Sequence, residues 1–332
     1  MIPLQTASGH PVTHVVFSPD GATVAVAQPH YGVTLLERTT GRTLGACALP
    51  RRDVLTGLTF CGDGRFLAAA SHKGVEVFDA ATGAPVAHSF RPRCKDLRLA
   101  ERGGELIGGR RSDDVCVVWR PDVTAADGFD LDSVAGELKL LGALSPDGRF
   151  ALTFGPLGRG ELIDLTADRT VATVEYAEGA HFYRWPGKAT FRLLGHRFAI
   201  NDGDTLDVYD ASELEDETAD QYADTPLVQR ANGTNQAVAP MPHVALKPTF
   251  TLKPEKAGER DWHPPFALLA DGRGLLVKRP RNRVQLWDVP TGTLVNEWSW
   301  RFEWVTCVAA SADGQTAVAG GRFGRVLLWD LD

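Results

Sequence analysis

The amino-acid sequence predicts an all-β fold, a seven-bladed β-propeller of four-stranded antiparallel sheets. A Gly-containing turn is followed about 16 residues later by an aromatic or apolar residue, and this pattern occurs seven times along the 332 residues. One clear copy is Asp313-Gly314 ahead of Trp329. The pattern has a period of about 42 residues, and each period holds four short strand-like runs. Such a period is typical of a propeller, in which each repeat forms one sheet of a ring.

The spacing of the repeats is regular except in one place. Alignment on the residue that follows the third strand of each unit gives intervals of 42, 41, 44, 46, 78 and 42 residues. The long interval exceeds the others by 78 − 42 = 36 residues, which predicts one insertion. The seven aligned positions are Glu37, Asp79, Arg120, Asp164, Asp210, Asp288 and Asp330.

The first unit shows how the strands are assigned. Pro and Gly in the turn Ser18-Pro19-Asp20-Gly21 supply the two backbone conformations that a tight turn needs. The flanking runs are apolar nearly throughout, as expected of strands covered on both faces by neighbouring sheets. The predicted strands are Val12–Phe17, Thr23–Ala27, Val33–Leu36 and Thr43–Leu49.

The fifth unit is the weakest and carries the insertion, residues 211–260. Its first strand is predicted at Ala189–Arg192 and its third at Leu206–Tyr209. The insertion opens with an acidic run and continues through several prolines, a composition that favours an extended arm. Its fourth strand is either Thr249–Leu252, with most of the arm on the bottom face, or Leu227–Gln229, with the arm leaving from the top.

The two ends of the sequence predict how the ring closes. The last unit stops at Asp332, directly after its third strand, so its outer strand must come from elsewhere. Ile2–Thr6 is the one unassigned strand-like run ahead of the first unit. We therefore expect this N-terminal strand to pair with the C-terminal blade and remove an exposed sheet edge.

Composition limits the classes of function. The net charge of −7 argues against nucleic acid or an anionic membrane as partner. The chain has no apolar run long enough to span a bilayer, and its start has no secretory signal. Five scattered cysteines fit reduced thiols in the cytoplasm. The histidines and cysteines show no metal-ligand spacing, so no cofactor is expected.

These residues resemble the WD40-repeat family. The resemblance rests on Trp287-Asp288 and Trp329-Asp330, on Gly9-His10 ahead of the first strand, and on turns such as Ser145-Pro146-Asp147-Gly148. It implies a non-catalytic platform for proteins or peptides. The acid that the family often places between the second and third strands is mostly missing; Pro280-Arg281 and Arg322-Phe323 stand there in the last two units.

A propeller places its connections on two faces. We call the top face the one formed by connections between the second and third strands of a sheet and between successive sheets. Basic residues outnumber acids in these connections, and most are arginines, which suit bidentate capture of carboxylate or phosphate. The predicted partner-binding residues are Arg51, Arg52, Arg91, Arg93, Arg110, Arg111, Arg279, Arg281, Arg283, Arg301, Trp304, Arg322 and Arg325.

Three functions are consistent with this pattern. The first is a cytoplasmic scaffold whose top face binds an acidic or phosphorylated protein segment, with Trp304 as an aromatic anchor. The second is a propeller hydrolase or lactonase with a small molecule or metal in the central channel. The third, a nucleic-acid platform, fits the net charge least well. The alternative without a binding role also remains open: these arginines are solvated, and Trp300 or Trp304 packs between blades.

Overall fold

Repeated turns define the strands of the computed structural model, which describes residues 2–5, 9–49, 55–61, 64–71, 74–90, 97–102, 105–110, 116–119, 141–144, 150–154, 159–164, 169–175, 190–194, 197–201, 205–211, 245–253, 255, 265–269, 271–300 and 304–331. In the first turn the Thr23 N–H donates to Ser18 Oγ at 2.9 Å, and Gly21 has φ of 70°. Ser311 and Gly314 repeat this geometry in the last unit, where the Thr316 N–H donates to Ser311 Oγ at 3.0 Å. Glycine is favoured at such positive φ because it has no Cβ.

The described strands form seven sheets, and within each sheet the consecutive strands are antiparallel neighbours. The first three sheets contain β2 His14–Phe17, β3 Thr23–Gln28, β4 Gly32–Glu37 and β5 Thr43–Cys47; β6 Leu55–Cys61, β7 Phe66–Ser71, β8 Gly74–Asp79 and β9 Pro85–Phe90; and β10 Leu97–Arg102, β11 Glu105–Arg110 and β12 Cys116–Trp119. A fourth strand of the third sheet would lie outside the described residues.

The remaining four sheets follow the same order along the chain. They contain β13 Leu141–Leu144, β14 Phe150–Phe154, β15 Arg159–Asp164 and β16 Arg169–Glu175; β17 Thr190–Leu194, β18 Arg197–Asn201, β19 Leu206–Asp210 and β21 Phe250–Leu252; β22 Phe266–Leu268, β23 Gly274–Arg279, β24 Arg283–Asp288 and β25 Thr293–Ser299; and β26 Val305–Ala310, β27 Thr316–Gly321 and β28 Arg325–Asp330. A short 3₁₀ turn, η1 Pro280–Asn282, joins β23 to β24.

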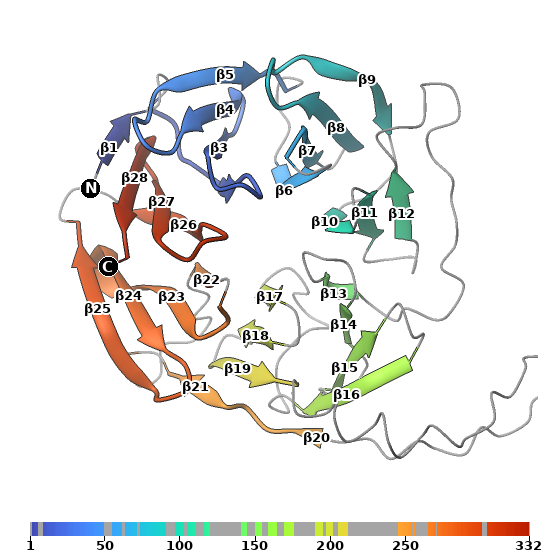
Figure 1. The fold of residues 1–332 in the computed structure, drawn as a ribbon, viewed down its shortest axis with the longest axis vertical. Helices are drawn as coiled ribbons and strands as arrows, with labels where there is room; N and C mark the ends of the chain where they lie inside the picture. Colours follow the sequence, from blue (N-terminus) through green and yellow to red (C-terminus); the bar gives the residue numbers. More distant parts are fainter. Residues whose placement is uncertain are drawn as a thin grey trace, which may run out of the picture.

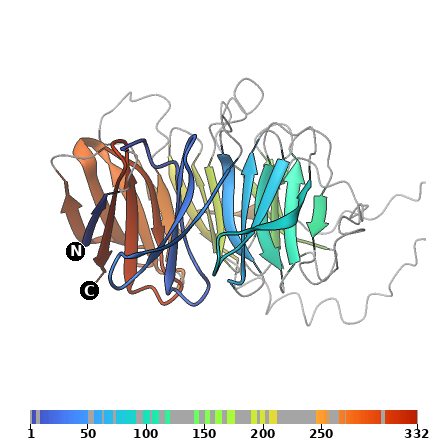
Figure 2. The ribbon, with the colours of Figure 1, turned by 90° about the horizontal axis from the view of Figure 1, so that it is seen from above.

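The sheets stand one after another around a common axis (Figure 1). The first strand of each sheet contacts the first strands of both neighbouring sheets, and β26 of the last sheet contacts β2 of the first. Seen edge-on, the strands run across the thickness of the disc (Figure 2). The all-β class and the propeller arrangement predicted from the repeats are therefore observed.

The N-terminal strand β1, Ile2–Gln5, completes the last sheet. It pairs antiparallel with β28, with Ile2 opposite Leu328 and Gln5 opposite Arg325. The two chain ends consequently lie near each other at the same sheet (Figure 1). This pairing is the one predicted for the N-terminal run.

The end of the predicted insertion supplies two strands. β21 pairs antiparallel with β19 and is the fourth strand of the fifth sheet, so the Thr249–Leu252 alternative is correct. A shorter strand that was not predicted, β20 Ala245–Leu246, pairs parallel with β16 at the outer edge of the fourth sheet. Residues 212–244, including the alternative at Leu227–Gln229, lie outside the described residues.

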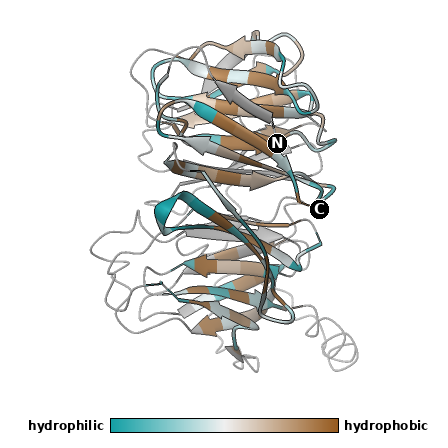
Figure 3. Cartoon of the chain, turned by 90° about the vertical axis from the view of Figure 1, so that its left-hand side faces the viewer, coloured by the Kyte–Doolittle hydropathy of each residue, from teal (hydrophilic) through white to brown (hydrophobic). Residues whose placement is uncertain are grey.

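Apolar side chains from adjacent sheets form the core. Ala25 and Leu35 of the first sheet are buried together with Leu58 and Phe60 of the second. The first and last sheets share a core in the same way, with Val24 packed in one cluster with Val318. The strands are mostly hydrophobic, whereas hydrophilic residues gather at the turns (Figure 3). Packing between sheets therefore holds the disc together and leaves the connections available for binding.

Candidate functional site on the top face

Contacts between connections confirm that the two kinds of top-face connection lie together. Trp304, just ahead of β26, has the guanidinium carbon of Arg322, from the β27–β28 turn, 5.3 Å from its ring centroid. His10, ahead of β2, packs its ring 4.4 Å from that of Tyr31 in the β3–β4 turn. In both pairs a connection between sheets meets a connection within a sheet, as the propeller geometry requires.

Arg281 stands exposed on the top face at the tip of the β23–β24 hairpin. Its backbone has φ of 62°, and Asn282 beside it has φ of 61°. Asparagine tolerates this left-handed conformation better than arginine does, so the turn holds Arg281 at a modest energetic cost. Among the residues that the structure describes, Arg281 forms no ion pair. Its guanidinium is thus placed to meet an anion from outside.

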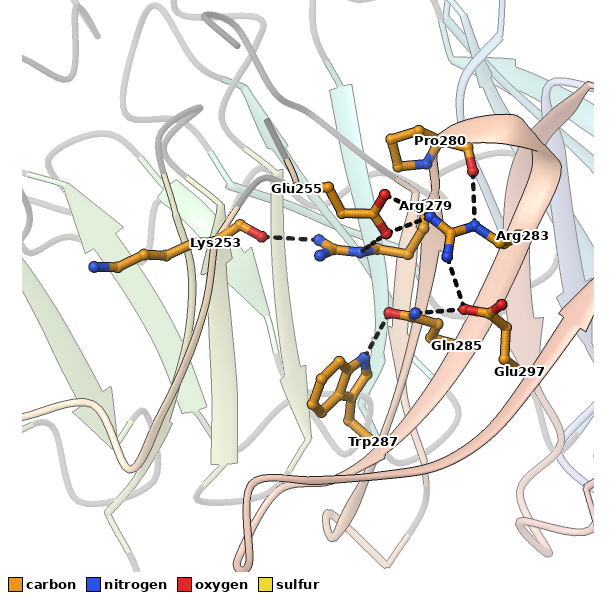
Figure 4. Close-up of polar contacts among 8 residues, drawn as sticks. All are labelled: Lys253, Glu255, Arg279, Pro280, Arg283, Gln285, Trp287 and Glu297. Atoms are coloured by element: carbon orange, nitrogen blue, oxygen red, sulfur yellow. Dashed lines mark hydrogen bonds and ion pairs between the residues drawn. The ribbon is translucent and has the colours of Figure 1, made fainter. Parts of the chain in front are cut away.

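Arg279 and Arg283 have a different environment, because both bind a carboxylate of the same chain (Figure 4). Arg283 donates to both carboxylate oxygens of Glu255 at 2.5 Å, and Arg279 Nε lies 3.3 Å from Glu255 Oε1. Arg279 also donates to the Lys253 carbonyl at 2.9 Å, and only 7% of its side chain is exposed. The structure therefore places the Arg279 side chain buried beside Glu255 at the top face, and not exposed as the sequence predicted.

A chain of polar side chains extends from Arg283 along the sixth sheet. Arg283 Nη1 donates to Glu297 Oε2 at 3.1 Å, and the Gln285 amide donates to the same oxygen at 2.6 Å. The Trp287 indole in turn donates to Gln285 Oε1 at 3.1 Å. Each member has a partner, so the network fixes the orientation of Arg283.

Trp304, Arg322 and Phe323 form an exposed aromatic and cationic patch on the last sheet. Trp304 is 59% exposed and Phe323 58%. The Arg322 N–H donates to the Trp304 carbonyl at 2.8 Å, which joins the two connections. Arg325, the first residue of β28, is also exposed. Large exposed aromatics beside arginine are typical of binding hot spots.

A further exposed aromatic residue lies on the other side of the junction between the last and first sheets. The Val12 N–H donates to the Gly321 carbonyl at 3.0 Å, next to Arg322. Gln28 Nε2 donates to the carbonyl of His10 at 2.6 Å, and the His10 ring packs on Tyr31, which is 58% exposed. Aromatic surface therefore occurs on both sides of this junction.

Trp300 packs between blades, which was the alternative to a role in binding. It is buried, and its ring centroid lies 4.9 Å from that of Trp329 in the last sheet, so it packs between sheets. Arg110 is the last residue of β11. The other predicted arginines, Arg51, Arg52, Arg91, Arg93, Arg111 and Arg301, lie outside the described residues.

Sequence reasoning missed Glu255, Glu297, Tyr31 and Phe323. Phe323 could have been found, since it stands beside Arg322 in a turn where an acid is expected. Glu255 could not, because its position depends on which distant segment supplies the fourth strand of the fifth sheet. Local sequence carries no signal for that choice.

The described part of the chain holds no group of three or more His, Cys, Asp or Glu side chains that could bind a metal ion. Burial raises the pKa of Cys47 to about 11 and that of Cys307 to about 12, so both stay protonated thiols at neutral pH. No helix in these residues is both long and apolar enough to cross a membrane.

The fold and the repeats define the class of protein as a β-propeller, and comparison with known proteins specifies it further. The family model "WD domain, G-beta repeat" matches residues 1–28. Among solved structures the chain is similar to the β-propeller domain of Cps50 (Swd1) from Myceliophteria thermophila, with 17% sequence identity, a TM-score of 0.68 and 100% of each chain covered. No curated protein matches the sequence. The repeat match and the propeller fold confirm the predicted resemblance to the WD40-repeat family.

Proposed function

We propose that this protein is a closed seven-bladed propeller that acts as a non-catalytic scaffold and binds an acidic or phosphorylated protein segment on its arginine-rich top face. WD40 propellers typically serve as platforms for other proteins, which supports the general role. Pairing of β1 with β28 and contact of β26 with β2 support the closed ring. We further propose a cytoplasmic location, where its cysteines remain reduced.

One observation carries the choice of ligand: exposed cations accompany exposed aromatic rings on the same face. Arg281 and Arg322 stand at the tips of neighbouring hairpins, and Arg322 stacks on a Trp304 ring that is 59% exposed. Arginine binds carboxylate and phosphate in a planar, bidentate manner. A tryptophan beside it offers apolar contact to the rest of the segment.

The experiment measures the affinity of an Asp/Glu-rich peptide that carries one phosphoserine. We expect Arg281→Glu and Arg322→Glu each to weaken binding by about tenfold, because charge reversal replaces an attraction by a repulsion. Affinity should also fall as salt rises, since exposed charges are screened.

Arg42→Glu is the matched control, because Arg42 is an exposed arginine in the β4–β5 turn of the opposite face. It should change affinity less than twofold. Equal loss in all three variants would mean that net charge alone governs binding. An affinity that is indifferent to salt and to Arg281 and Arg322 would overturn the proposal.

A further inference from the structure

The carboxylate of Glu255 lies between two guanidinium groups of the neighbouring sheet. Arg283 grips both of its oxygens at 2.5 Å, and Arg279 approaches one of them at 3.3 Å (Figure 4). Glu255 follows β21 of the fifth sheet, whereas both arginines belong to the sixth. The contact therefore joins the end of the predicted 211–260 insertion to the top face.

The arginines are held in place by groups other than Glu255. The carbonyl of Lys253 accepts from Arg279, and the carbonyl of Pro280 accepts from Arg283 at 3.1 Å. Glu297 binds the remaining side of Arg283. Arg279 is more than nine-tenths buried, with 7% of its side chain exposed. A pair of fixed guanidinium groups is a binding site for an anion whichever carboxylate occupies it.

The ion pair between Glu255 and Arg283 is accessible to solvent. The side chain of Glu255 is 29% exposed, and the side chain of Arg283 is 25% exposed. This access to water lets an anion from outside reach the two guanidinium groups, and exchange of one carboxylate for another preserves the charge-assisted hydrogen bonds. An incoming carboxylate can therefore replace that of Glu255 at low cost. A phosphate, with up to two charges and three acceptor oxygens, competes still better.

We propose that Arg279 and Arg283 form an anion subsite of the top face, that Glu255 is its internal occupant, and that a carboxylate or phosphate of the bound segment takes the place of Glu255. This inference rests on the proposed function. The subsite lies at the base of the hairpin whose tip carries Arg281, so one acidic segment can engage both. Glu255 then lowers the affinity of the top face for weakly charged segments and leaves it open to strongly charged ones.

The test compares Glu255→Gln with wild type, using the phosphoserine peptide and a second peptide with glutamate in place of phosphoserine. The variant should bind both peptides three- to tenfold more tightly, with the larger relative gain for the glutamate peptide, which competes less well against Glu255. Glu37→Gln, an acid on the opposite face, changes the net charge equally and should give less than a twofold gain.

A second readout does not need the peptide. The ¹⁵N resonances of Arg279 and Arg283 Nε–Hε should shift when inorganic phosphate is added, at lower phosphate concentration in Glu255→Gln than in wild type. Wild-type protein alone provides this test if the variant does not fold. Failure of phosphate to shift either resonance, in wild type and variant, would overturn the subsite.

The two proposals fail in different ways. Salt-dependent peptide binding that is lost on charge reversal of Arg281 but is unchanged by Glu255→Gln would overturn the role of Glu255 and leave the scaffold function standing. Absence of peptide binding in both proteins, with phosphate still shifting the Arg279 and Arg283 resonances, would overturn the scaffold function and leave the anion subsite standing.

Discussion

At the scale of single residues, the turns of the bottom face hold acids whose charge stabilises the fold. The Arg38 side chain donates to Asp313 at 2.6 Å across the junction of the first and last sheets. This contact, with hydrogen bonds from Ser311 and the Gln315 N–H, lowers the pKa of Asp313 to about 2. Hydrogen bonds from neighbouring side chains also lower the pKa of Asp20 and of Asp79, chiefly those from Ser18 and Thr82.

A lowered pKa fixes the direction of the pH effect. The folded state holds Asp313 ionised more strongly than the unfolded chain does, so its stabilisation is complete above about pH 4 and is lost as pH falls toward 2. We expect Asp313→Asn to lower the melting temperature at pH 7 and to lose most of this effect by pH 2.5. Melting curves of both proteins from pH 7 to 2.5 check this. A difference that stays constant down to pH 2.5 would contradict it.

Arg279 and Arg281 show what sequence can and cannot supply at this scale. Both were predicted as surface arginines from one Pro-Arg turn, and the hairpin itself was located correctly. Whether each arginine is buried depends on Lys253 and Glu255, which arrive from a different sheet. A local pattern specifies the turn but not its neighbours, so the sequence could not separate the two roles.

At the scale of elements, strands with a strong apolar pattern were predicted to within a few residues. Predicted Thr23–Ala27 is β3 Thr23–Gln28, and predicted Val33–Leu36 is β4 Gly32–Glu37. The two-residue strand β20 was missed, because so short a run has no periodicity to recognise. The glycine turns carried most of the information, since they recur at fixed spacing.

The N-terminal strand provides the test at this scale. Deleting residues 2–8 removes β1 and exposes the hydrogen-bonding edge of β28. We expect the melting temperature to fall by at least about 5 °C, measured by calorimetry. Adding a synthetic peptide of residues 1–8 should restore part of the loss. An unchanged melting temperature would show that β1 does not contribute to the last sheet.

At the scale of the whole molecule, the two ends of the chain meet in one sheet, where β1 pairs with β28. β28 pairs with β1 without a turn that joins the two strands directly, whereas a covalent turn joins β24 to β25 of the sixth sheet. The repeats predicted this pairing, because Ile2–Thr6 is a strand-like run that belongs to no repeat. They could not predict the path of the 211–260 segment, which lacks a repeat.

If the sheets are equivalent, the chain ends can be relocated from the last sheet to another sheet without loss of the fold. A circular permutant can join Asp332 to Met1 through a short Gly-Ser linker and open the chain between Pro290 and Thr291. Its new ends lie in the sixth sheet, where β25 becomes the N-terminal strand and pairs with the C-terminal strand β24. We expect the permutant to fold with a melting temperature within about 5 °C of wild type, because the native ends lie close together. Failure to fold, with the linked but unopened parent stable, would contradict closure by equivalent sheets.

The strand β20 has a consequence for how the propeller unfolds locally. A stretch of eight residues, 245–252, pairs first with β16 of the fourth sheet and then with β19 of the fifth. One continuous segment therefore forms the outermost strand of both sheets. Neither edge strand can dissociate without displacing the other, so we expect the outer edges of the fourth and fifth sheets to unfold together.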